Sequence, residues 1–189
     1  MVATLVRAKE KLLRAADRRF YADGIAATGV DAVVREAGVA KMTLYNNFAS
    51  KDKLVAAYLD QRHAEWLDLL ARRVNAAGSA RERVLAVFDA YLDHAGFDSA
   101  SGYRGCGLLN GAGELPSGHP GRLAVRAHKA QVESFLVSAC RAAGAGHPEE
   151  LGEHLYLLVE GAVVSAGLEG NPDRLLRARQ LAAALIDGQ

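Results

Sequence analysis

The residues best suited to contact another molecule lie between Lys41 and Asn47, in the run KMTLYNN. If this run is helical with Leu44 at the centre of its inner face, about 100° per residue turns Met42 and Asn46 outward. Lysine donates to guanine acceptors, asparagine pairs with adenine, threonine serves either, and a thioether packs on a thymine methyl. The run therefore predicts a helix that reads base edges through Lys41, Met42, Thr43 and either Asn46 or Asn47, with Tyr45 beside them on the outer face.

The preceding residues predict the element that would hold this helix. Val30, Val33, Val34 and Ala37 recur at helical spacing and give a first short helix one buried face. Gly38 follows where the chain must turn sharply, and glycine reaches the left-handed conformation without steric penalty. With a second short helix over about residues 40–48, the segment reads as a helix-turn-helix.

The N-terminal third of the chain resembles the DNA-binding domain of the tetracycline-repressor-like (TetR) family. The resemblance is carried by Phe20, Gly24, Thr28, Val30, Ala37-Gly38-Val39, Thr43-Leu44-Tyr45, Phe48, Lys51 and Leu54. Two residues depart from the family pattern. Ala40 stands where the family often has serine, so a helix cap of about 1 kcal/mol is missing. Met42 stands where a small residue is common.

The resemblance implies an all-α protein with DNA-binding residues 1–50 and a ligand-binding and dimerisation body, 51–189. It implies that Tyr45, Lys51 and Thr28 grip phosphate, which fixes the register of the base contacts. Packing between helices is the alternative for Tyr45, and ordinary solvation is the alternative for Lys51. The expected partners are double-stranded DNA carrying an inverted repeat, a second copy of the chain and a small-molecule inducer, with repression as the family's usual mode.

Charge and composition agree with such a regulator. Residues 1–62 hold 11 Lys/Arg and 7 Asp/Glu, a net charge of +4, whereas the whole chain of 189 residues has +1. A positively charged N-terminal segment suits contact with the phosphates of a nucleic acid. Two cysteines and no signal peptide predict a cytoplasmic protein, and no run free of charged residues is long enough to cross a membrane.

After the helix-turn-helix, the spacing of apolar residues predicts amphipathic helices and no strand. The whole chain is expected to form about nine helices. Ser50 is placed to cap a long helix that continues to about Ala77. Ser79 and Glu82 form a capping box before the next helix. A cap, a proline and a first-turn acid at Asn171, Pro172 and Asp173 begin the last one.

The last two helices each carry an apolar band that is wide for a single neighbour. The resemblance implies that they form a four-helix bundle with those of a second subunit, whereas the pattern alone equally allows burial in the monomer core. The residues assigned to the dimer interface are Leu155, Leu158, Ala162, Val163, Leu175, Leu181 and Leu185.

The body also offers candidates for a ligand pocket, with aromatic walls and polar anchors. For any one of them, packing in the core is the alternative. Glu160 interrupts an apolar helix, where an unpaired carboxylate is costly, so it should pair with an arginine across the dimer or face a cationic ligand. The candidate residues are Trp66, Phe88, Tyr91, Cys106, Asn110, His128, Tyr156 and Glu160.

Cys106 supports a second hypothesis, in which the regulator senses oxidants or electrophiles. It follows Arg104-Gly105 near an expected helix start, and both a cation and a helix N-terminus favour the thiolate. A buried, inert cysteine is the alternative.

Enzymatic activity is not expected, because the chain has no GxSxG elbow, no HExxH pair and no phosphate-cradling glycine loop. Six histidines are scattered without a ligand interval, so no metal, catalytic residue or cofactor is expected. A helical interaction module that binds no DNA is the remaining alternative.

Overall fold

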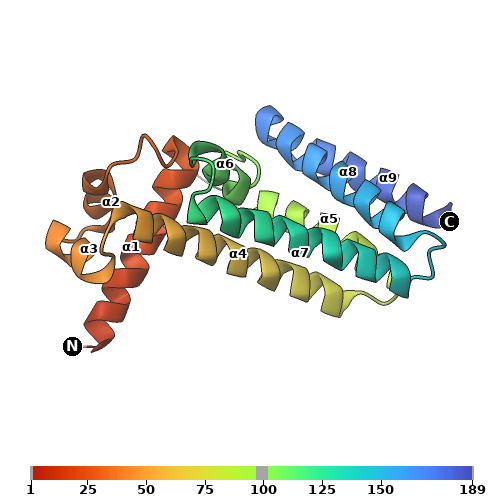
Figure 1. The fold of residues 1–189 in the computed structure, drawn as a ribbon, viewed down its shortest axis with the longest axis horizontal. Coiled ribbons are helices and arrows are strands. Elements are labelled where there is room, and N and C mark those ends of the chain that lie inside the picture. Colours follow the sequence, from red (N-terminus) through yellow and green to blue (C-terminus); the bar gives the residue numbers. More distant parts are fainter. Residues whose placement is uncertain (1, 97–101, 189) are drawn as a thin grey trace. The chain divides into compact units, whose positions relative to one another are not determined.

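A computed structural model describes residues 2–96 and 102–188, and this part of the chain is helical without a strand. The predicted all-α fold of about nine helices is confirmed, and Figure 1 shows their arrangement. Their bounds are α1 Val2–Asp23, α2 Val30–Ala37, α3 Lys41–Asn47, α4 Lys51–Ala76, α5 Ala80–Gly96, α6 Gly107–Glu114, α7 Pro120–Ala142, α8 Pro148–Glu169 and α9 Asp173–Asp187.

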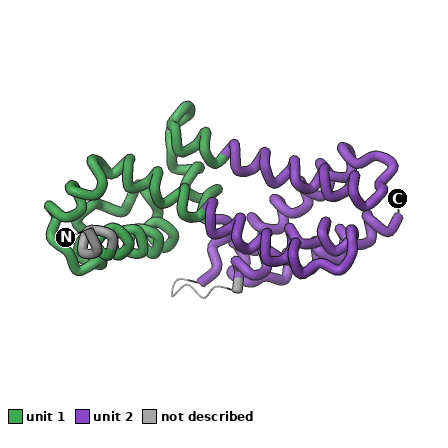
Figure 2. Tube along the Cα trace, turned by 90° about the horizontal axis from the view of Figure 1, so that it is seen from below, with its two compact units in different colours: residues 1–62, 107–125 green, residues 63–106, 126–189 purple. Residues whose placement is uncertain are grey.

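The helices form two compact units, coloured separately in Figure 2. Unit 1 contains residues 1–62 and 107–125, and unit 2 contains residues 63–106 and 126–189. The chain therefore passes between the units within α4, just before α6 and within α7. The division into a DNA-binding segment, 1–50, and a body, 51–189, remains a prediction about function.

The core of unit 1 is built on α1, which packs against α2 and α3. Leu12 and Phe20 of α1 are buried, and the Phe20 ring meets the Tyr58 ring edge-on with centroids 5.4 Å apart. Outside this core, Arg18 and Arg19 of α1 both donate to the Glu36 carboxylate of α2, at 2.6 and 2.5 Å. These pairs fix the rotation of α2 on α1.

The turn between α2 and α3 depends on Gly38. Its φ of 63° and ψ of 39° place it in the left-handed region, as predicted. The Gly38 N–H donates to the Arg35 carbonyl and the Val39 N–H to the Val34 carbonyl, both at 3.2 Å. This pair of hydrogen bonds is the Schellman motif, which satisfies the last carbonyls of α2 and ends the helix.

The predicted helix starts are present, with two differences. Asn171 Oδ1 accepts the Asp173 N–H at 3.0 Å, but α9 begins at Asp173, so Pro172 precedes the helix. Ser50 Oγ accepts the Lys53 N–H at 3.2 Å, and Ser79 Oγ accepts the Glu82 N–H at 3.1 Å. The Glu82 carboxylate reaches back to the Gly78 N–H, 2.6 Å away, one residue before the expected donor. Two side-chain bonds therefore hold the start of α5.

Unit 2 is formed by most of α4 together with α5, most of α7, α8 and α9, and α9 packs against both α5 and α8. Its core contains the fully buried Phe88, Tyr91, Leu136, Leu155 and Leu175. The backbones of α7 and α8 approach so closely that a Cβ on Gly152 would lie 2.8 Å from the Val137 Cα. No side chain other than hydrogen fits there.

The α2–α3 turn gives a first testable prediction. Replacing Gly38 by alanine should lower the free energy of unfolding by about 1 kcal/mol, because an L side chain is strained at this φ. Gly113→Ala in α6 is the matched control, since its φ is not positive and a Cβ there meets nothing within 4 Å. Urea unfolding should show Gly113→Ala at or above the parent stability; equal destabilisation by both changes would contradict the role of Gly38.

Candidate functional site

The outward face of α3 is the first candidate site. Leu44 is fully buried and Phe48 nearly so, whereas Met42 is 68% exposed and Tyr45 46%. Asn46 is exposed as well. The predicted orientation of α3 is therefore confirmed, while its contact with DNA remains a prediction.

The polar side chains of this face differ in whether they already have a hydrogen-bond or ion-pair partner in the protein. Lys41 pairs with Asp31 of α2 at 2.8 Å, and this carboxylate raises the pKa of the lysine. The Asn47 amide donates to the Thr43 carbonyl one turn earlier, at 2.8 Å. The Asn46 amide has no protein partner among the described residues, so it is the freest candidate for a base contact.

The turn that precedes α2 gathers three side chains that the sequence did not place together. Glu114 at the end of α6 accepts the N–H groups of Ile25 and Ala26, at 3.0 and 2.7 Å. Lys51 of α4 donates to the Ile25 carbonyl at 2.6 Å. Thr28 donates to the Gly24 carbonyl at 2.6 Å.

These bonds contradict the prediction that Thr28 contacts phosphate. Its side chain is only 3% exposed and its hydroxyl proton is used inside the turn, so it does not face a phosphate. We assign Thr28 to positioning the start of α2. Lys51 keeps two further N–H groups on its half-buried ammonium after its bond to Ile25.

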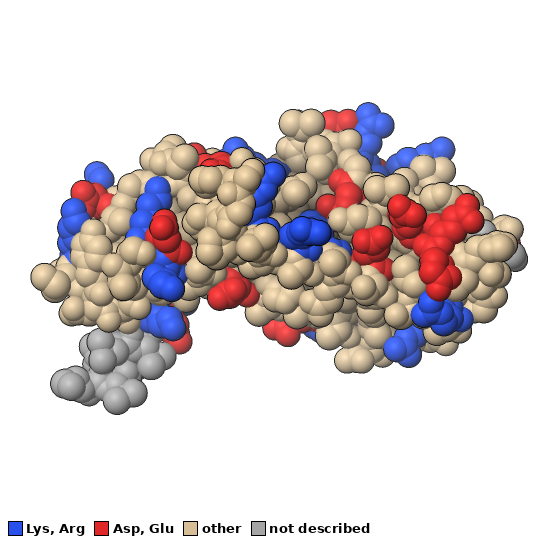
Figure 3. Space-filling view, in the orientation of Figure 1, with Lys and Arg blue, Asp and Glu red and all other residues tan. Residues whose placement is uncertain are grey.

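The charge of unit 1 is mixed on its surface. On the face in view, Figure 3 shows basic and acidic side chains interspersed over the helices of unit 1 instead of one continuous basic patch. Several of the basic groups are neutralised by neighbours, among them Arg18, Arg19 and Lys41. On this face, unit 1 therefore presents separate charged and polar groups and no broad positive field.

A buried polar cluster in unit 2 is the second candidate site. Lys129 of α7 donates to Glu160 of α8 at 2.6 Å and to the Tyr91 hydroxyl of α5 at 3.1 Å. Burial alone would lower the pKa of Lys129, but Cys106, Tyr91 and the Glu160 carboxylate outweigh it and hold this pKa above its ordinary value. Burial raises the pKa of the Tyr91 phenol, which therefore stays neutral.

The pairing of Glu160 differs from both predictions made for it. Its partner is a lysine of the same chain, neither an arginine across a dimer nor a cationic ligand. Lys129 was missed, although the sequence carried a signal: it lies four residues after Val125 and three before Val132, on the apolar stripe of α7. A lysine on such a stripe needs a buried carboxylate.

Trp66 and His128 extend this cluster and leave two polar atoms unused. His128 is 3% exposed, and its Nδ1 lies 2.8 Å from Nδ1 of His63. Its ring also packs edge-on against Trp66, with centroids 5.0 Å apart. Trp66 Nε1 and His128 Nε2 are both buried without a hydrogen-bond partner.

Of the other ligand candidates, Cys106 lies near enough to Lys129 to raise its pKa, and burial followed by Glu160 raises the pKa of Tyr156. Phe88 is fully buried core, Cys106 is 6% exposed, and Tyr156 is half-buried. Asn110 is exposed and belongs to unit 1. Among the described residues, no three His, Cys, Asp or Glu side chains are grouped to hold a metal ion.

The residues assigned to the dimer interface divide into two sets. Leu155, Ala162, Val163 and Leu175 are at most 8% exposed within the single chain, so they are core of unit 2 and the assignment is corrected for them. Leu158 is half-buried, and Leu181 and Leu185 are each 41% exposed. A separate exposed stripe was missed; it follows one side of α8 through Leu157, Gly161, Val164 and Leu168.

Comparison with known proteins identifies the family of this architecture. Residues 12–58, from α1 into α4, match the family of bacterial regulatory proteins described as the tetR family. A TetR-family transcriptional regulator from Streptomyces coelicolor is 31% identical, with a TM-score of 0.84 over 97% of this chain and 94% of that one. A tetR-type regulator from Streptomyces avermitilis is 32% identical, with a TM-score of 0.72 over 93% and 97%.

Named regulators show similarity over a shorter stretch. The transcriptional activator FasR of Mycolicibacterium smegmatis is 38% identical over 95 residues, which are 50% of this chain and 42% of that protein. The transcriptional regulator TtgR of Pseudomonas putida is 36% identical over 87 residues, 43% of this chain and 41% of that one. The aligned part thus spans less than half of these two relatives. Since the solved Streptomyces structures are similar over nearly the whole chain, the protein belongs to the TetR family of transcriptional regulators.

Proposed function

We propose that this protein is a cytoplasmic repressor that binds an inverted-repeat operator as a homodimer and is released by a small-molecule inducer. The observation that carries the proposal is the outward face of α3, where Met42, Tyr45 and Asn46 stand exposed on a helix anchored by the buried Leu44. FasR is named an activator and TtgR a regulator, so repression is proposed from the family's usual mode.

The proposed division of labour follows from which groups are free. Asn46 reads a base, and Met42 packs on a thymine methyl. Lys41 reaches a guanine only by leaving Asp31, so it contributes less to preference than Asn46. Tyr45 and the remaining N–H groups of Lys51 bind phosphate and set the register.

The proposed dimer uses the exposed stripe of α8 together with Leu181 and Leu185 of α9. Leu157, Gly161, Val164 and Leu168 repeat at four, three and four residues, which places them on one side of the helix. Gly161 has nothing within 4 Å of a built Cβ, so a second helix can approach its backbone. By length and composition α8 also passes for a membrane span, with a mean hydropathy of 1.2, but a core helix bordering an interface has the same composition.

A twofold dimer would place two α3 helices about 34–36 Å apart, one turn of DNA, and therefore requires an inverted repeat. An inducer that binds better to a dimer with a different spacing of its two DNA-binding segments, residues 1–50, shifts the population away from the DNA-binding state. Within unit 1, the Glu114 bonds to Ile25 and Ala26 supply a route for this signal, because any displacement of α6 moves the turn before α2.

We place the inducer at the polar cluster of unit 2, beside Trp66 and His128. The Trp66 N–H and His128 Nε2 are unsatisfied, and a buried polar group without a partner costs about 1–3 kcal/mol. Lys129 and Glu160 already neutralise one another. The site therefore suits an uncharged ligand that offers an acceptor to Trp66. The alternative of a redox sensor at Cys106 has no support in its burial or in the comparisons.

The DNA-binding face gives the second prediction. Lys51→Ala and Tyr45→Ala should weaken binding to all duplexes and reduce the slope of log affinity against log salt by about 0.9 for each lost phosphate contact. Asn46→Ala should instead remove about 1–3 kcal/mol of discrimination at one base pair of each half-site. Selection from random duplexes, followed by salt titration, separates the two effects.

Arg126→Ala is the control for these variants, because it removes an exposed charge from unit 2 and should leave both readouts unchanged. Unaltered affinity and preference in all three α3 and α4 variants, or no enriched palindrome with the parent protein, would remove the proposed DNA site.

The third prediction concerns the dimer. Replacing both Val164 and Leu168 by glutamate should raise the dimer dissociation constant at least about 100-fold, because charged groups cannot be buried unpaired in an apolar interface. Sedimentation velocity should then show monomers that keep the parent helical content. Leu123→Glu, another exposed leucine at 54%, is the control and should remain dimeric. A double variant that sediments as the parent dimer would place the interface elsewhere.

The fourth prediction tests the uncharged state of the inducer site. Burial, then Lys129 and His63, lower the pKa of His128 from 6.5 to about 3. The unfolded chain therefore binds one more proton than the folded protein between these values, so stability falls as the pH falls through this window. From pH 6.5 to pH 5 the parent should lose about 1.5 kcal/mol more than His128→Gln in urea unfolding. Equal losses would show that His128 is charged in the folded protein.

A further inference from the structure

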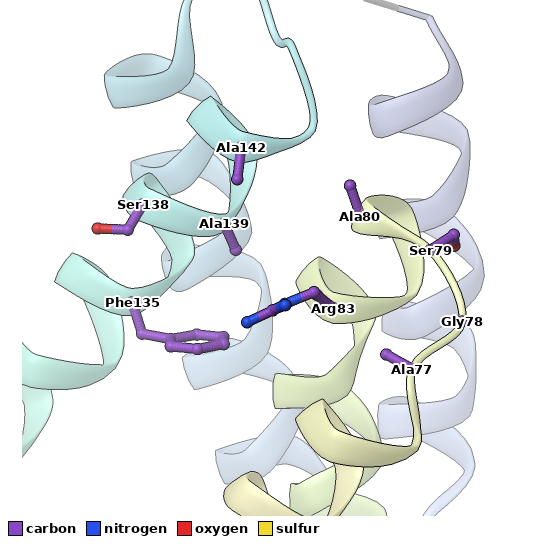
Figure 4. Close-up of a pocket in the computed structure, with 9 residues that line it drawn as sticks. All are labelled: Ala77, Gly78, Ser79, Ala80, Arg83, Phe135, Ser138, Ala139 and Ala142. Carbon is purple, nitrogen blue, oxygen red and sulfur yellow. The ribbon is translucent and has the colours of Figure 1, made fainter.

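A pocket of about 530 Å³ lies in unit 2, between the α4–α5 turn and the second half of α7. Figure 4 shows its walls, which share no residue with the polar cluster around Lys129 and Glu160. The lining residues are Ala77, Gly78, Ser79, Ala80, Arg83, Phe135, Ser138, Ala139 and Ala142.

The shape of the pocket comes from its small side chains. Four alanines and a glycine leave the space between α5 and α7 open, and Phe135 supplies the one aromatic surface. The volume falls within the range of about 300–1,000 Å³ that is usual for small-molecule sites. An apolar, flat molecule would pack against the Phe135 ring and the alanine walls.

Arg83 is the only charged residue of the lining, which contains no Asp or Glu. Two residues earlier, Arg81 is paired with Asp187 at 2.6 Å, whereas the guanidinium of Arg83 has no ion-pair or hydrogen-bond partner in the described part of the chain. Figure 4 shows the Arg83 guanidinium extending from α5 toward the ring of Phe135. The positively charged guanidinium of Arg83, which has no acidic partner, thus lies beside the Phe135 ring.

The start of α5 adds donors on the same side. Ser79 Oγ accepts the Glu82 N–H, and Figure 4 shows this hydroxyl turned away from Arg83, so the donors in question are backbone groups. The first N–H groups of this 17-residue helix, at Ala80 and Arg81, have no acceptor among the described residues, and the helix dipole there favours negative charge. Ser138 lines the pocket from α7, but Figure 4 shows its hydroxyl turned away from Arg83.

We propose that this pocket binds a small aromatic carboxylate, with the carboxylate on Arg83 and the start of α5 and the ring against Phe135. The planar guanidinium matches a carboxylate in two parallel hydrogen bonds, which Arg makes more strongly than neutral donors do. This site is independent of DNA binding and of the inducer site proposed above. It is selective for anions, whereas the cluster at Trp66 suits uncharged ligands.

The test uses 2-naphthoate as the probe and 2-naphthamide as its uncharged analogue, titrated into the full-length protein by calorimetry. The parent protein should bind one 2-naphthoate per chain at least about tenfold more tightly than the amide. Arg83→Gln should abolish this preference by weakening naphthoate about tenfold, and Phe135→Leu should weaken both compounds severalfold. Arg81→Gln removes an equal charge next to the pocket and should bind naphthoate as the parent does.

Two results would overturn the proposal: no saturable naphthoate binding to the parent, or undiminished binding to Arg83→Gln. Circular dichroism checks that each variant is folded, which is expected because Arg83 is exposed. Duplex DNA binding is measured on the same samples. Its absence in the parent would contradict the proposed regulator while leaving the carboxylate site standing, so the two failures are distinguishable.

Discussion

The helix proposed to read DNA, α3, is positioned by hydrogen bonds to one short turn, Gly24–Thr28. Side chains from two other helices satisfy backbone groups of this turn: Glu114 accepts the N–H groups of Ile25 and Ala26, and Lys51 donates to the Ile25 carbonyl. Thr28 closes the turn from within. Because α2 begins two residues after Thr28, these bonds orient α2 within unit 1 and, through the turn at Gly38, also α3.

Unit 2 contains an ion pair in its interior, whereas the ion pairs described in unit 1 lie at its surface. The interior pair is Lys129 with Glu160, held by a neutral Tyr91. Such a pair contributes little net stability, since desolvation offsets its attraction, but breaking it by losing one partner is costly. The cluster therefore fixes the relative placement of α5, α7 and α8 and leaves only the uncharged atoms of Trp66 and His128 available.

Sequence patterns predicted the parts of the structure that depend on local periodicity. The phase of α3 follows from Leu44, and the stop at Gly38 and the cap at Ser50 follow from backbone geometry. Patterns could not decide which of two apolar sides of α8 faces the chain's own core, so Leu155 and Val163 were placed outside. Contacts between distant segments, such as Glu114 with Ala26, leave no periodic trace and were missed.

The chain enters unit 1 twice, and this has a consequence for building chimeric regulators. Residues 107–125 complete a unit begun by residues 1–62, with Gly107 fitted against Tyr58 and Gly111 against Ile25 and Leu59. A graft that exchanges only the N-terminal segment would join a new operator specificity to a foreign α6. A functional hybrid must therefore carry both segments together, or restore a carboxylate at position 114 facing the transplanted turn.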